Sequence, residues 1–158
     1  MKKFTFALKI SAYLLLCGIF LSFSASGSIE EDWTYIHRVI TDHYDFATGP
    51  RNLKKYEIFV TSMGFCRYKR IYNSGKVEYF AFNLTKYKSI DYHGDTRSGI
   101  LILRTRGDDV IVQTYHDSKG GDIDSMATYM AIPLRDVEAE DLIGLSEKLQ
   151  QMSHKLRQ

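Results

Sequence analysis

The chain has 158 residues, of which 44% are hydrophobic and 13% aromatic, and only two are prolines. This composition excludes an intrinsically disordered chain, because so many apolar and aromatic residues can form a packed core. Basic residues number 21 and acidic residues 19, which gives a net charge of +2. This near balance argues against nucleic acid as a partner, since such binding depends on a clear basic excess.

Residues 1–28 have the pattern of an export signal. Three lysines form a basic start, an apolar run of about 14 residues follows, and small residues occupy positions 24–28. We therefore expect cleavage near residues 24–28 and a periplasmic or secreted mature protein. The alternative is an uncleaved membrane anchor, although the run is shorter than the roughly 20 residues that span a bilayer. A lipoprotein acylated at Cys17 is a weaker alternative, because bulky Leu16 precedes this residue.

Removal of the signal leaves residues 29–158, the size of a single domain. The signal takes three lysines with it, so 18 basic residues face 19 acidic ones and the net charge is about −1. Cys66 is then the only cysteine, and no internal disulfide can form. We expect its thiol to be buried, because an unpaired cysteine usually behaves as a small apolar residue.

Residues 30–46 are predicted to form a helix. Apolar and aromatic residues recur at steps of three and four and would form one buried stripe. The stripe contains Trp33, Ile36, His37, Ile40 and Tyr44. Ser28 and Glu31 fit a capping box at the start of this helix, and Gly49-Pro50 breaks the chain after it.

The middle of the chain is predicted to form about six strands, because β-branched and aromatic runs alternate with turn residues. The expected strands are residues 56–62, 65–72, 77–92, 99–105, 110–115 and 125–134. Short connections force neighbouring strands to be antiparallel, since a parallel pair needs a long crossover. The expected topology is therefore an antiparallel meander.

A second helix is predicted over residues 138–156, where leucine and methionine recur at helical spacing. The whole pattern indicates an α+β domain over residues 29–158. Its antiparallel meander sheet would carry an N-terminal and a C-terminal helix on one face.

A basic and aromatic segment in the strand 65–72 is the first candidate site. It contains Arg67, Tyr68, Lys69, Arg70 and Tyr72. Tyrosine and arginine are frequent anchors in protein interfaces, so the segment could bind a protein partner or an anionic ligand outside the cytoplasm. The alternative is that the charges protect a sheet edge while the tyrosines pack across strands.

Two loops supply a candidate divalent-metal site. A single meander would place the loops 93–97 and 117–122 side by side at one end of the sheet. That end would gather His93, Asp95, His116, Asp122 and Asp124. Carboxylates and imidazoles are ligands for Ca²⁺ or Zn²⁺, although Asp and Gly are also ordinary turn residues.

The sequence contains no G-x-S-x-G, H-E-x-x-H or phosphate-loop motif. We therefore expect an exported, non-catalytic binding protein that uses a Tyr/Arg-rich sheet face and has no cofactor. One alternative is a metal-binding module or metal-assisted hydrolase built on the loops around residues 93–95 and 116–124. Another is a structural envelope protein tethered to the membrane only by an uncleaved signal.

Overall fold

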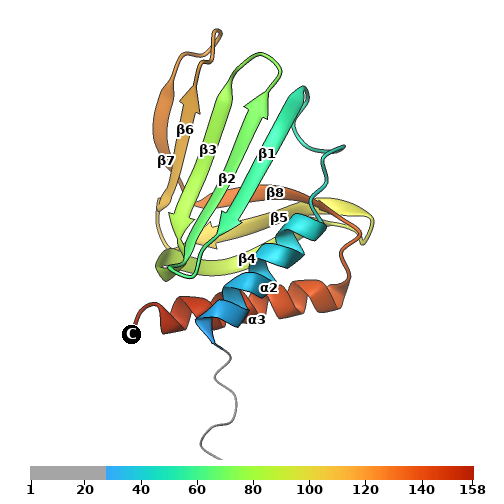
Figure 1. Ribbon diagram of the computed structural model, residues 1–158, viewed down its shortest axis with the longest axis vertical. Coiled ribbons are helices and arrows are strands. Elements are labelled where there is room, and N and C mark those ends of the chain that lie inside the picture. The colour runs from blue at the N-terminus through green and yellow to red at the C-terminus, as the bar shows by residue number, and fades with distance from the viewer. Residues whose placement is uncertain (1–27) are drawn as a thin grey trace, which may run out of the picture.

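The computed structural model describes residues 28–158, which form two long helices, a short 3-10 turn and eight strands (Figure 1). In chain order they are α2 (Ile29–Asp42), β1 (Leu53–Val60), β2 (Phe65–Tyr72), β3 (Val77–Asn83), η1 (Leu84–Lys86), β4 (Tyr87–Gly94), β5 (Ser98–Thr105), β6 (Val110–Tyr115), β7 (Ile123–Ala127), β8 (Tyr129–Arg135) and α3 (Ala139–Lys155). The predicted α+β class, with antiparallel strands and a helix at each end, is confirmed. The predicted signal peptide lies outside the described residues.

Helix α2 begins as its sequence predicts. The Ser28 hydroxyl accepts from the backbone N–H of Glu31, and the Glu31 carboxylate accepts from the Ser28 N–H. The helix ends at Asp42 rather than at residue 46, because the following segment pairs with β8. Tyr44 forms an isolated bridge with Leu134, and this tertiary pairing overrides the helical stripe.

The strands form two sheets rather than one meander of about six strands. The five-stranded sheet has the order β1-β2-β3-β6-β7, and the three-stranded sheet has the order β4-β5-β8. All pairs are antiparallel. The chain therefore leaves the first sheet after β3, returns to it for β6 and β7, and leaves it again for β8.

Both departures interrupt a segment that the sequence predicts as one strand. Between β3 and β4, the Asn83 carboxamide accepts from the Thr85 N–H and caps the turn η1, while Leu84 is fully buried. Between β7 and β8, the Thr128 carbonyl accepts both the N–H and the hydroxyl of Thr105. These two turns redirect the chain from one sheet to the other.

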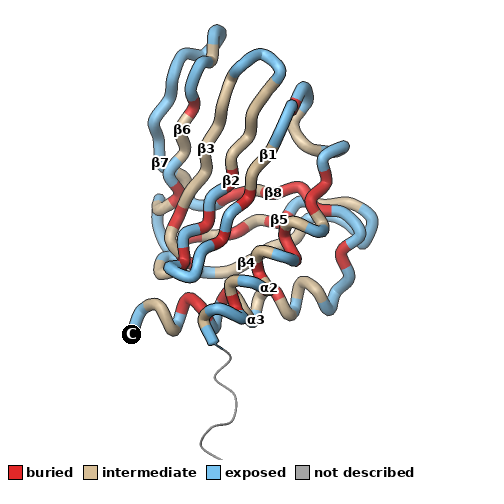
Figure 2. Tube along the Cα trace, in the orientation of Figure 1, coloured by how far each residue is buried: buried red, intermediate tan, exposed pale blue. Residues whose placement is uncertain are grey.

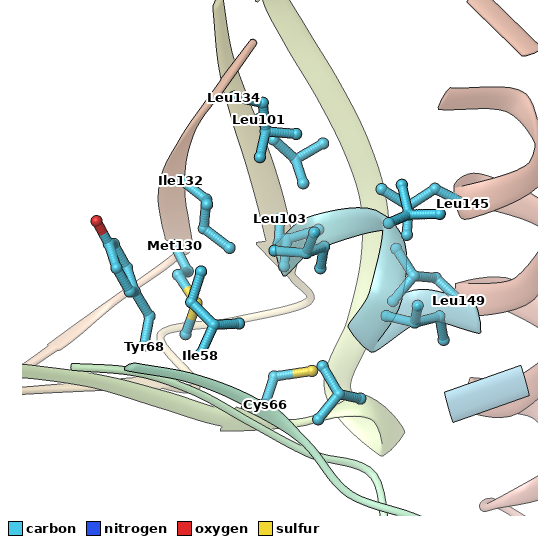
Figure 3. Packing of buried hydrophobic residues seen from close by; sticks show 14 of the residues in the cluster. Ile58, Cys66, Tyr68, Leu101, Leu103, Met130, Ile132, Leu134, Leu145 and Leu149 are labelled. Carbon is cyan, nitrogen blue, oxygen red and sulfur yellow. The ribbon is translucent and has the colours of Figure 1, made fainter. Parts of the chain in front are cut away.

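One core lies between the inner sides of the two sheets and the two helices (Figure 3). The five-stranded sheet contributes Ile58, Cys66 and Tyr68 from its inner side. The three-stranded sheet contributes Leu101, Leu103, Met130, Ile132 and Leu134, and α3 contributes Leu145 and Leu149. In Figure 2 the buried segments gather where β4, β5 and β8 meet the lower strands and the helices. The upper lengths of β1, β2 and β3 are mostly half-buried or exposed.

Candidate functional site

The outer side of the five-stranded sheet carries exposed apolar side chains, and we call this side the open face. Strand register places two continuous rows of residues on it. The first row contains Phe59, Arg67, Ala81, Ile111 and Met126, and the second contains Glu57, Lys69, Tyr79, Gln113 and Asp124. Phe59 and Met126 are 51% and 52% exposed, so this side of the sheet is not part of the core.

Alternation along each strand produces this two-sided sheet. Successive side chains of a strand point to opposite sides, and β2 shows the rule clearly. Cys66 and Tyr68 are buried against the core, whereas Phe65 and Arg67 are exposed. The outer residues are nevertheless not uniformly polar, because exposed aromatic and aliphatic side chains stand among the charged and polar ones. An antiparallel sheet with one solvated side usually alternates apolar-in and polar-out, and the open face departs from that pattern.

Some charged side chains of the open face have an ion-pair partner among the described residues and others do not. Glu57 lies 2.8 Å from the Lys55 ammonium and 3.8 Å from that of Lys69. Hydrogen bonding to Lys55 is the main reason that the pKa of Glu57 is lowered. The pKa of Lys69 is raised, first by hydrogen bonding to Tyr79, whose ring centroid is 5.2 Å from the ammonium. Arg67, in contrast, has no ion-pair partner within residues 28–158.

A shallow depression of about 600 Å³ occupies the middle of the open face. It is lined by Phe65, Arg67, Val77, Tyr79, Ala81, Ile111, Gln113, Tyr115 and His116. Tyr79 and Tyr115 meet edge to face, with ring centroids 5.7 Å apart. Ala81 has the smallest of the lining side chains and lies on the central strand. The depression is therefore floored by β3 and framed by aromatic rings and the Arg67 guanidinium.

The structure divides the five residues of the predicted partner-binding segment between the two sides of the sheet. Arg67 and Lys69 lie on the open face. Tyr68 is 0% exposed, and its hydroxyl is 2.6 Å from that of Tyr44 inside the core. Arg70 and Tyr72 also lie on the inner side. The segment is not a sheet edge, because β2 pairs with β1 on one side and with β3 on the other.

Arg70 belongs to an interior network rather than to a contact surface. Its guanidinium carbon is 4.6 Å from the Tyr68 ring centroid and 4.7 Å from that of Phe80. It donates to the Ala131 carbonyl at 3.2 Å, which ties the five-stranded sheet to β8. It also lies 3.4 Å from the Glu78 carboxylate. These contacts indicate that Arg70 connects the two sheets.

Glu78 is the centre of this network. The Tyr72 hydroxyl donates to its carboxylate at 2.6 Å, and the Lys76 ammonium lies 2.9 Å away. Burial, followed by the bond to Glu78, raises the pKa of Tyr72 to about 12. Burial alone would raise the pKa of Glu78, but hydrogen bonds from Tyr72 and Lys76 outweigh it and the pKa is lowered. Tyr72 is therefore a structural donor.

The five candidate metal ligands lie on two different sheets. His93 and Asp95 belong to the β4–β5 hairpin of the three-stranded sheet, and His116, Asp122 and Asp124 belong to the β6–β7 segment of the five-stranded sheet. In Figure 1 the β6–β7 loop lies at the top of the view, far from the β4–β5 turn at the right. The single meander that would bring these loops together is absent. Nowhere in residues 28–158 do three His, Cys, Asp or Glu side chains form a group that could hold a metal ion.

The acidic residues of these loops stabilise turns. The Asp95 carboxylate accepts from the backbone N–H groups of Arg97 and Ser98, and these bonds are the main reason that its pKa is lowered. Asp117 accepts from the N–H groups of Lys119 and Gly120, which lowers its pKa to about 2. This is the ordinary turn chemistry of aspartate.

Most residues of the open face were not singled out by the sequence. The row from Phe59 to Met126 joins five strands, and only the strand order and register place its members side by side. One signal was available in the sequence. Phe59, Phe65 and Ile111 each stand next to a buried residue in the same strand and therefore point to the other side of the sheet. On an ordinary solvated side these positions would be polar.

Comparison of the chain with models of protein families, with curated proteins and with solved structures gives no match. In the part of the chain from residue 28 onward, no helix has both the length and the apolar character needed to cross a membrane.

Proposed function

We propose that the chain is an exported, non-catalytic binding protein that contacts another protein through the open face. One observation carries the proposal: aromatic and aliphatic side chains are exposed on four of the five strands of a sheet whose inner side forms the core, and the half-buried side chains of the central strand β3 lie between them. Contiguous exposed apolar patches on soluble proteins usually mark interaction sites. Single exposed apolar residues would carry no such meaning, but here Phe59, Ile111 and Met126 share one cross-strand row.

The residue types of the open face favour a protein partner. Phenylalanine, tyrosine, methionine and arginine are enriched at the centres of protein interfaces, where they fill pockets and exclude water. Arg67 is exposed and stands between Phe59 and Ala81 in the first row. A guanidinium without an ion-pair partner among the described residues can donate hydrogen bonds to a carboxylate of another molecule. We therefore assign Arg67 as the polar anchor of the surface.

The ionisable groups with displaced pKa values support a non-catalytic role. Burial raises the pKa of Cys66 to about 12, so its thiol is not a nucleophile at neutral pH. Tyr72 and Glu78 belong to the interior network described above. The displaced groups of the open face, Glu57 and Lys69, owe their shifts to the pairs they form with neighbouring side chains. Export is the part of the proposal that rests on residues 1–28 alone.

Site-specific photo-crosslinking in the exporting cells tests this proposal. A photoreactive amino acid is placed at Tyr79, at the centre of the open face, and separately at Ile143 on α3. Ile143 is 59% exposed and lies far from the open face in the fold, so it is a matched surface control. We expect a covalent protein adduct at Tyr79, its loss when R67E is added, and none at Ile143. Equal adducts at both positions, or none at Tyr79, would overturn the proposal.

A further inference from the structure

We draw no further inference here: the strongest candidate, the outer edge of β7 at which the five-stranded sheet ends, is exposed, but nothing in the part of the chain that the structure describes shows which strand or partner would cover it.

Discussion

A buried carboxylate joins the two helices, and removal of both of its partners should strongly destabilise the fold. Asp32 on α2 is 0% exposed, and its oxygens lie 2.9 Å from the Lys148 ammonium and 2.6 Å from that of Lys155, both on α3. The side chains of the two lysines are 31% and 24% exposed. The variant K148M/K155M leaves the carboxylate buried without these partners while keeping side chains of similar length.

The expected loss of unfolding free energy at pH 7 is about 3–5 kcal/mol, the usual cost of an uncompensated buried charge. Either single variant should cost about 1.5–3 kcal/mol, the contribution of one hydrogen bond to a charged group. Addition of D32L to the double variant should recover part of the loss, because no buried charge then remains. Such recovery distinguishes an electrostatic effect from a general packing defect.

The loss should shrink as the pH falls from 7 toward 4. In the wild type, burial would raise the pKa of Asp32, but the bonds from Lys155 and Lys148 outweigh it and lower the pKa. Its contribution is therefore complete above the unfolded pKa of about 3.9 and is lost as the pH falls through the folded pKa. In K148M/K155M only burial remains, so the pKa should rise above 3.9 and protonation should stabilise that variant on acidification.

Urea unfolding, followed by the fluorescence of the single tryptophan, Trp33, measures these free energies. Trp33 neighbours Asp32 on α2 and reports on this helix directly. The control variant K54M/K88M removes two exposed lysines that form no ion pair with described residues, and it should change stability by less than about 0.5 kcal/mol. A loss below about 1 kcal/mol in K148M/K155M, or a loss that is independent of pH, would refute this reasoning.

Three further predictions concern the core. Y68F should cost about 1–3 kcal/mol because it leaves the buried Tyr44 hydroxyl unpaired, and Y44F/Y68F should be closer to the wild type in a urea titration. G99A should lower the thermal midpoint, because an added Cβ would lie 2.6 Å from the Tyr92 hydroxyl and 2.9 Å from a backbone carbonyl; an unchanged midpoint would contradict the packing described. Cys66 should resist alkylation at pH 8 and react fully in urea, as peptide mass spectrometry can check; rapid labelling of the folded protein would contradict its burial.

Local signals predicted the helices and most strand positions. The box formed by Ser28 and Glu31 and the stripe containing Leu145 and Leu149 are properties of short segments, and both helices begin and end within a few residues of the prediction except at residues 43–46. The strand predicted over residues 65–72 matches β2 at both ends. Periodicity is a local property, so it locates an element without its tertiary partners.

The pairing of strands could not be predicted in the same way. β3 pairs with β6 and β5 with β8, and both pairings skip intervening strands. The alternation of apolar and polar residues along a strand is compatible both with this strand order and with a single meander. It determines which residues of a strand share a side of the sheet, but not which strand lies beside it. Polar turns split each of the predicted strands 77–92 and 125–134 into two, and one or two hydrogen bonds hold each turn. The hydrophobic pattern of the sequence does not predict these hydrogen bonds.

The candidate site was predicted only in part for the same reason. Arg67 and Lys69 belong to the predicted segment and lie on the open face, whereas most of the apolar side chains around them come from the other four strands of the sheet. The candidate metal site depended on two loops being neighbours in a meander, so it depended directly on the strand order. Asp32 illustrates a further limit. Its place in the first turn predicts a helix-dipole contact, but the structure shows that it also joins α2 to α3.

The most direct test of the open face is methionine oxidation of the protein in the cells that produce it and of the dilute purified chain. Met126 is 52% exposed in the first row of the open face, and Met63 is 68% exposed in the β1–β2 turn. Both should oxidise readily in the dilute chain, whereas in the cells Met126 should be protected and Met63 should not. Equal oxidation of the two methionines in both settings would contradict the proposal that the open face contacts another protein.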